Sequence, residues 1–142
     1  MKSLKIDSCP LCQSSHEPLI WTNNIFRVVL IKNINYRGYC RVDLIEHKKE
    51  MAELDAEIKE KFMLIIFKIE RFILEYLNPD KINLASLGNI CPHLHWHIIP
   101  RFKNDNHFPD SIWSTQKRIN INEFSRTEEI KFISALQTVL SQ

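Results

Sequence analysis

The apolar positions change their period along the chain, and this change predicts the secondary structure. In residues 23–31, 39–47, 81–87 and 93–101, apolar side chains alternate with other residues or form short runs, which is typical of β-strands. From Asp55 onward the apolar residues recur at steps of three and four as far as Leu77, which makes one stripe on a helix. Strands around one dominant helix predict an α+β fold with a mostly antiparallel sheet.

Polar residues mark the ends of the predicted elements. Asp55 is suited to cap the start of the long helix, and Asn78-Pro79 ends it, because proline disfavours helical geometry in the residue before it. Gly38 marks the turn between the first two strands. Ser125 and Glu128 have the spacing of a capping box, which predicts a C-terminal helix at about 125–140.

The composition narrows the class of protein. A chain of 142 residues that is 44% hydrophobic and 25% charged is long enough for one domain with a substantial core. No apolar stretch approaches the ~20 residues that a membrane span needs. The net charge of +2 is too small to indicate nucleic-acid binding. We therefore expect a cytoplasmic protein of one domain, residues 1–142, with neither a membrane nor a nucleic acid as partner.

The most informative segment contains His93, His95 and His97, which alternate with Leu94 and Trp96. On a strand, such histidines project to one side and lie about 6.5–7 Å apart, so that they can converge on a group of phosphate size. Burial for packing alone would leave their ring nitrogens in need of partners. Two chemistries remain open from these residues: a zinc site, or catalysis by a nucleophilic imidazole.

The segment before these histidines favours a phosphate ligand. Gly88 and Asn89 precede the histidine strand, and a flexible backbone with an amide side chain can hold anionic oxygens. Neither a P-loop nor a dinucleotide-binding glycine motif is present in the sequence.

The segment "HLHWHII" resembles the signature of the histidine triad (HIT) family, and "YRGYCRVDLIEHKKEMAEL" resembles bacterial HIT proteins of the diadenosine polyphosphate hydrolase type. Trp113 lies where many members have a late aromatic residue. The resemblance spans about residues 9–115 and implies a HIT-like domain with a C-terminal extension. It also implies a hydrolase or transferase that acts on phosphoanhydride or phosphoramidate bonds, has a purine nucleotide as substrate, needs no cofactor for catalysis and forms a homodimer through the long helix and an adjacent strand.

The resemblance also implies roles for individual residues. His95 would be the nucleophile that forms a nucleotidyl-histidine, His97 would contact phosphate oxygens, and His93 would orient the site. Ribose and phosphate contacts would come from Asn33, Asn83, Gly88 and Asn89. The chain departs from the usual pattern at Lys32-Asn33, where the family has an acidic ribose contact, and at Tyr39, where many members have a further histidine. The loop from Asn83 to His95 is about one residue shorter.

Cys9 and Cys12 form a CxxC motif, which by itself fits a chance pair, a redox turn or part of a metal site. Some bacterial HIT proteins bind structural zinc through such a motif, and the resemblance implies the ligands Cys9, Cys12, His47 and His93. His16 is an alternative to His47.

Two other functions compete with the hydrolase. The chain could be a nucleotide-binding regulatory or scaffold protein with negligible turnover, or an enzyme in which all three triad imidazoles chelate zinc.

Overall fold

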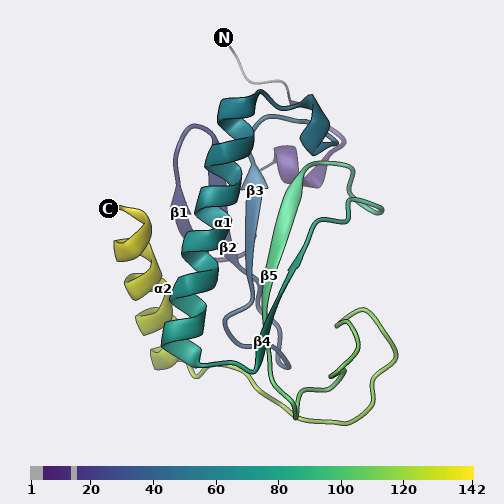
Figure 1. The fold of residues 1–142 in the computed structure, drawn as a ribbon, viewed down its shortest axis with the longest axis vertical. Helices are drawn as coiled ribbons and strands as arrows, with labels where there is room; N and C mark the ends of the chain where they lie inside the picture. The colour runs from purple at the N-terminus through teal and green to yellow at the C-terminus, as the bar shows by residue number, and fades with distance from the viewer. Residues whose placement is uncertain (1–4, 14–15) are drawn as a thin grey trace.

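A five-stranded antiparallel sheet carries two α-helices in the computed structural model, within the part of the chain that it describes, residues 5–13 and 16–142 (Figure 1). Residues 1–4 and 14–15 of the predicted domain lie outside that description. The strands have the spatial order β1-β2-β3-β5-β4. Their bounds are Leu19–Thr22 for β1, Phe26–Leu30 for β2, Cys40–Leu44 for β3, Lys81–Ala85 for β4 and His95–Arg101 for β5.

The two helices form as their sequence patterns predict. Helix α1 spans Ala56–Leu77, with Asp55 at its N-cap position, and it ends at Asn78, which adopts the left-handed conformation. Helix α2 spans Arg126–Leu140 and begins with a capping box in which Ser125 and Glu128 exchange hydrogen bonds. Two short 3₁₀ helices, Pro10–Cys12 and Met51–Glu53, complete the elements. Within the described ranges, no helix is long and apolar enough to span a membrane.

The two faces of the sheet differ in character. Both helices pack on one face, where the predicted stripe of α1 meets strand residues such as Val28, Val42 and Ile98 in one apolar core. Figure 1 shows α1 lying along the sheet with α2 beside it. The cross-strand register puts the alternate residues Arg41, Asp43, His95, His97 and Ile99 on the opposite face. The predicted α+β fold is therefore confirmed, and the histidine-bearing face is the one that the helices leave free.

Several strands are shorter than predicted. The side-chain oxygen of Asn23 accepts hydrogen bonds from the backbone N–H groups of Ile25 and Phe26, so residues 23–25 form a turn rather than the start of β2. Strand β5 begins at His95, and His93 lies in the bend before it. The prediction that all three histidines share one strand is therefore wrong for His93.

Gly38 fixes the position of the turn between β2 and β3. Its φ is +77°, and a Cβ atom at this position would lie 2.4 Å from Cδ1 of Leu77 at the end of α1. Glycine thus allows the chain to pass close to the helix and to enter β3 immediately afterwards. Tyr39, the next residue, is buried on the histidine-bearing face of the sheet.

Candidate active site and metal centre

Strands β3 and β5 bring the candidate catalytic residues together. In their antiparallel register, Asp43 lies opposite His95, and Arg41 lies opposite His97. The rings of His95 and His97 are 5.0 Å apart between centroids and nearly perpendicular, at 84°. The two histidines thus form a contiguous pair on the face of the sheet that the helices leave free, where His95 is buried and His97 is partly buried.

His95 is held by the backbone of its own chain. Its Nδ1 lies 2.6 Å from the carbonyl oxygen of His93, and because a carbonyl can only accept, Nδ1 must carry the proton. The other ring nitrogen, Nε2, then has a free lone pair. This is the tautomer that a nucleophilic imidazole requires.

His97 lies between two aromatic side chains. The hydroxyl of Tyr39 is 2.5 Å from its Nδ1, and the ring of Trp113 is 5.1 Å away between centroids. Burial, followed by the charges of His95 and Arg41, lowers the pKa of His97 to about 4. His97 is therefore neutral at pH 7 and carries a single N–H.

A buried ion-pair network lies beside the histidines, and the sequence analysis did not predict it. Asp43 is fully buried and accepts hydrogen bonds from the guanidinium groups of Arg27 and Arg41. Arg41 also pairs with Glu17, at 3.6 Å. The signal was available in "CRVDL", where Arg41 and Asp43 alternate with core residues and so must share the opposite face of the sheet. This network places the paired guanidinium of Arg41 next to His97.

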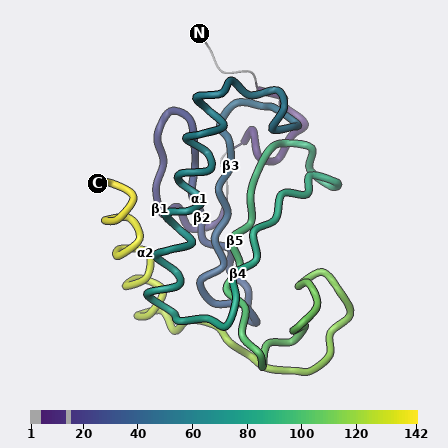
Figure 2. The backbone as a smooth tube through the Cα atoms, viewed as in Figure 1, coloured from purple at the N-terminus to yellow at the C-terminus, as the bar shows by residue number. Residues whose placement is uncertain are grey.

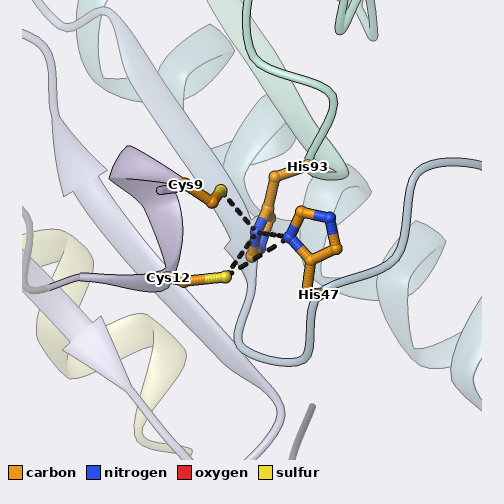
Figure 3. A group of neighbouring side chains, drawn as sticks. All are labelled: Cys9, Cys12, His47 and His93. Atoms are coloured by element: carbon orange, nitrogen blue, oxygen red, sulfur yellow. Dashed lines mark hydrogen bonds between the residues drawn. The ribbon is translucent and has the colours of Figure 1, made fainter. Parts of the chain in front are cut away.

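The side chain of His93 points toward the N-terminal segment, where Cys9 and Cys12 lie next to it (Figure 3). Its Nε2 lies 2.6 Å from the carbonyl oxygen of Leu44 and therefore carries the proton, so the lone pair is on Nδ1. That nitrogen is 3.4 Å from Sγ of Cys9, 3.4 Å from Sγ of Cys12 and 3.2 Å from Nδ1 of His47. His93 thus belongs to a buried Cys₂His₂ cluster.

The Cys₂His₂ cluster, Cys9, Cys12, His47 and His93, fits a tetrahedral metal ion. All its ligand atoms lie within 4.8 Å of one another, and all its side chains are buried. Tetrahedral zinc with Zn–S near 2.3 Å and Zn–N near 2.0–2.1 Å sets its ligand atoms about 3.3–3.8 Å apart. His47 completes the cluster, whereas His16 is exposed. Within residues 5–13 and 16–142, this is the single group with metal-ligand geometry, so the three triad rings do not form a chelate.

Three of the remaining predicted site residues, Asn83, Gly88 and Asn89, precede the strand of His95 and His97 in the chain. Asn83 is on β4, and its Oδ1 accepts a hydrogen bond of 2.7 Å from the buried guanidinium of Arg101. Gly88 and Asn89 are in the loop that connects β4 to β5, and Gly88 has a φ of +74°. The Asn83 oxygen is thus already bonded within the protein, and its amide nitrogen is the group that can reach a ligand.

Asn33 lies just beyond β2. Its Oδ1 accepts a hydrogen bond from the backbone N–H of Asn35, and it lines a cavity of about 290 Å³ together with Tyr36, Arg37 and Glu129. This cavity is separate from the Cys₂His₂ cluster and reaches the N-terminal part of α2.

Comparison with known proteins identifies the fold. The HIT domain family model matches residues 14–104. A histidine triad protein from Bradyrhizobium japonicum, blr8122, is 30% identical, with a TM-score of 0.74 over 86% of this chain and 89% of that chain. A histidine triad protein from Marinobacter aquaeolei VT8 is 22% identical, with a TM-score of 0.74 over 89% and 90%.

A third solved structure is described as a Zn-bound histidine triad family protein from Mycobacterium smegmatis. It is 19% identical, with a TM-score of 0.63 over 95% of this chain and 94% of that chain. No curated protein matches the sequence. The match to the HIT domain over most of the chain, together with these structures, shows that this chain belongs to the HIT domain family of histidine triad proteins.

Proposed function

We propose that this protein is a nucleotidyl hydrolase or transferase in which His95 attacks the α-phosphorus of a nucleotide. The observation that carries the proposal is the hydrogen bond from Nδ1 of His95 to the carbonyl oxygen of His93. It leaves Nε2 as the free nucleophile, on a ring that touches His97. Membership of the HIT domain family supports the same chemistry, because nucleotide binding and hydrolysis are general in that family.

In the first step, a bond forms between Nε2 of His95 and the α-phosphorus while the bond from phosphorus to the leaving group breaks. The electron pair of that bond departs with the leaving group, which for a phosphoanhydride is a phosphate anion. The imidazole becomes cationic once phosphorus is attached. Its Nδ1–H bond to the His93 carbonyl then becomes charge-assisted and stronger, which favours the intermediate.

In the second step, water attacks the phosphorus of the nucleotidyl-histidine. A P–O bond forms, the N–P bond breaks, and its electron pair returns to Nε2 of His95. The products are a nucleoside monophosphate and a proton. His97, neutral at pH 7, donates a hydrogen bond to the phosphoryl oxygens in both steps and offsets their growing charge.

For the substrate, we propose a purine nucleotide with a phosphoanhydride or phosphoramidate bond at its α-phosphorus, such as a diadenosine polyphosphate. Gly88 and Asn89 would hold phosphate oxygens, and the amides of Asn33 and Asn83 would contact the ribose. A panel of adenosine and guanosine substrates with different leaving groups, scored for monophosphate release, would define the substrate class.

We propose in addition that the Cys₂His₂ cluster holds a structural zinc ion. Zinc bound there would supply a cross-link between the N-terminal segment, the segment after β3 and the bend before β5, and no part of the reaction depends on it. The donor set, the spacing of the ligand atoms and the lone pair on Nδ1 of His93 support this proposal. The Zn-bound protein from M. smegmatis shows that a chain of the same fold can carry zinc.

The test of the nucleophile is the variant His95→Asn. We expect turnover to fall by at least about 1000-fold, while nucleotide affinity stays within about tenfold, because the lost nitrogen acts mainly in the transition state. Monophosphate release and the Kd of a non-hydrolysable nucleotide analogue measure the two quantities. His16→Asn, at an exposed histidine, is the matched control and should keep wild-type turnover.

The same assays separate the competing functions. Full turnover in His95→Asn would exclude His95 as the nucleophile. Tight nucleotide binding with no turnover in the wild-type protein would instead identify a nucleotide-binding scaffold protein.

A further inference from the structure

Tyr39 forms a buried hydrogen bond with His97. Its side chain is 5% exposed and packs with Tyr36 and Ile99 in a small apolar cluster on the histidine-bearing face. Its hydroxyl lies 2.5 Å from Nδ1 of His97, and the two rings are 5.7 Å apart between centroids. In the described part of the chain, Nδ1 of His97 is the one hydrogen-bond partner of this hydroxyl.

The direction of this hydrogen bond follows from counting donors and acceptors. If Nδ1 of His97 carried the proton and donated it, the hydroxyl proton of Tyr39 would be buried with no acceptor, which is unfavourable. If Tyr39 donates, both its proton and the Nδ1 lone pair are satisfied. Burial raises the pKa of Tyr39, so the phenol keeps its proton.

We propose that Tyr39 donates its hydroxyl proton to a hydrogen bond with Nδ1 of His97 and thereby holds His97 as the Nε2–H tautomer, with that N–H available to the substrate phosphate. Tyr39 is thus a positioning residue that acts through His97. The inference rests on the proposed function for its purpose, but the tautomer itself can be observed without substrate. No proton is transferred along this bond, because a neutral imidazole only needs to donate a hydrogen bond to a phosphoryl oxygen.

The consequence is a division of tautomers between neighbouring rings. His95 has its proton on Nδ1, fixed by a carbonyl, and presents a lone pair. His97 has its proton on Nε2, fixed by a phenol, and presents a donor. A nucleophile and an oxyanion donor side by side are what attack on a phosphate requires. Without the Tyr39 hydroxyl, His97 would sample both tautomers, and the Nδ1–H form would direct a lone pair at an anionic substrate.

The experiment compares wild-type protein with Tyr39→Phe and Tyr36→Phe. Long-range ¹H–¹⁵N NMR of the histidine rings reports which nitrogen carries the proton in the free protein. We expect Nε2–H for His97 in wild type and in Tyr36→Phe, and a gain of the Nδ1–H form in Tyr39→Phe. Tyr36→Phe is the matched control, because it removes a hydroxyl from the same apolar cluster. The hydroxyl of Tyr36 contacts Asp105 and His107 rather than His97.

Kinetics of the same variants test the purpose of the tautomer. We expect kcat of Tyr39→Phe to fall by about tenfold, less than the ~100-fold or greater loss that follows outright removal of an oxyanion donor, with KM changed by less than about threefold. An Nδ1–H tautomer in wild type would overturn the proposal, and this measurement needs no variant to fold. An unchanged kcat in Tyr39→Phe, despite a changed tautomer, would overturn the positioning role. Absence of turnover in wild type would overturn the proposed function, while the NMR result would still decide the tautomer.

Discussion

Each triad histidine is held by a hydrogen bond to a different residue. A carbonyl of β3 holds Nε2 of His93, a carbonyl before β5 holds Nδ1 of His95, and a phenol holds Nδ1 of His97. The second ring nitrogen of His93 faces two cysteines, that of His95 keeps a lone pair, and that of His97 would be an N–H donor in the tautomer proposed above. One sequence motif therefore provides three different chemical groups.

The lowered pKa of His97 predicts a pH dependence of stability. The pKa is about 4 in the folded state, against an ordinary value of 6.5. Between these values the unfolded chain binds the proton and the folded protein does not, so the free energy of unfolding falls as the pH drops from 6.5 to 4. In His97→Gln this contribution is absent, and we expect a flatter dependence in chemical denaturation measured at several pH values.

Neighbouring charged groups and His93 also affect how stability depends on pH. His95 and Arg41 lower the pKa of His97 further after burial, while the charge of Asp43 raises it. Burial also lowers the pKa of His93, so part of the acid sensitivity remains in the variant. Parallel stability curves for wild type and His97→Gln over this range would contradict the assignment.

At the residue scale, the sequence predicted part of the arrangement of the histidines but not the contacts that hold each ring. Alternation on a strand correctly predicts that His95 and His97 share a face. It fails for His93, because strand pairing begins only at His95. The bond from Tyr39 to His97 joins residues 58 positions apart, and sequence spacing carries no information about such a contact.

Among the elements, the N-terminal segment depends most on contacts made elsewhere in the chain. The short helix Pro10–Cys12 buries a single residue, Cys12. Arg27 of β2 donates hydrogen bonds to the carbonyl oxygens of Leu11 and Gln13, and the Cys₂His₂ cluster lies beside them. Since so few apolar contacts hold this segment, we expect the metal to provide much of its anchoring.

This anchoring predicts the effect of removing a ligand. We expect wild-type protein to contain close to one zinc per chain, and Cys9→Ser to contain almost none. The midpoint of thermal unfolding should fall by at least about 5 °C, because a ligand that binds the folded state alone stabilises it by more than ~1 kcal/mol. Metal analysis and calorimetry measure the two effects.

Cys91→Ser is the matched control for that variant. Cys91 is a half-buried neighbour of Cys9 but is not part of the Cys₂His₂ cluster, so its substitution should retain the metal. A metal-free wild-type protein as stable as the zinc-loaded form would end the zinc proposal.

Elements with their own local signals were predicted most accurately. Helices α1 and α2 carry caps and an apolar stripe, and both form where the sequence indicates. Strand β1 was missed, because it has four residues of which only Ile20 is buried, too few to show alternation. It exists because β2 offers it an edge for pairing.

On the scale of the whole molecule, chemistry and packing are on opposite sides of the sheet. The helices cover the apolar face of the sheet. The long segment between β5 and α2 extends past the end of the sheet before it returns to α2 (Figure 2). Buried Arg101, bonded to Asp105 at 2.8 Å, holds the start of this segment, from which Trp113 contacts His97. The histidine-bearing face and the outer side of α1 are thus on opposite sides of the molecule.

We propose that the outer side of α1 forms a homodimer interface. Leu64, Phe67 and Leu74 are 58%, 50% and 45% exposed, and their helical spacing puts them on one face. Exposed apolar patches of this kind mark association surfaces. In sedimentation velocity we expect wild-type protein at twice the chain mass of 16.9 kDa.

Phe67→Glu tests this interface directly. A charge buried at its centre loses hydration without a partner, so dimerisation should weaken by at least about thirtyfold. Ile119→Glu makes the same chemical change at an 85% exposed side chain in the segment between β5 and α2, and it should leave the dimer intact. A wild-type monomer, or a Phe67→Glu protein that still sediments as a dimer, would show that the copies do not meet through this face. Turnover by a monomeric Phe67→Glu protein would further show that each active site is complete within one chain, as expected when His95, His97 and Tyr39 lie on the sheet face opposite α1.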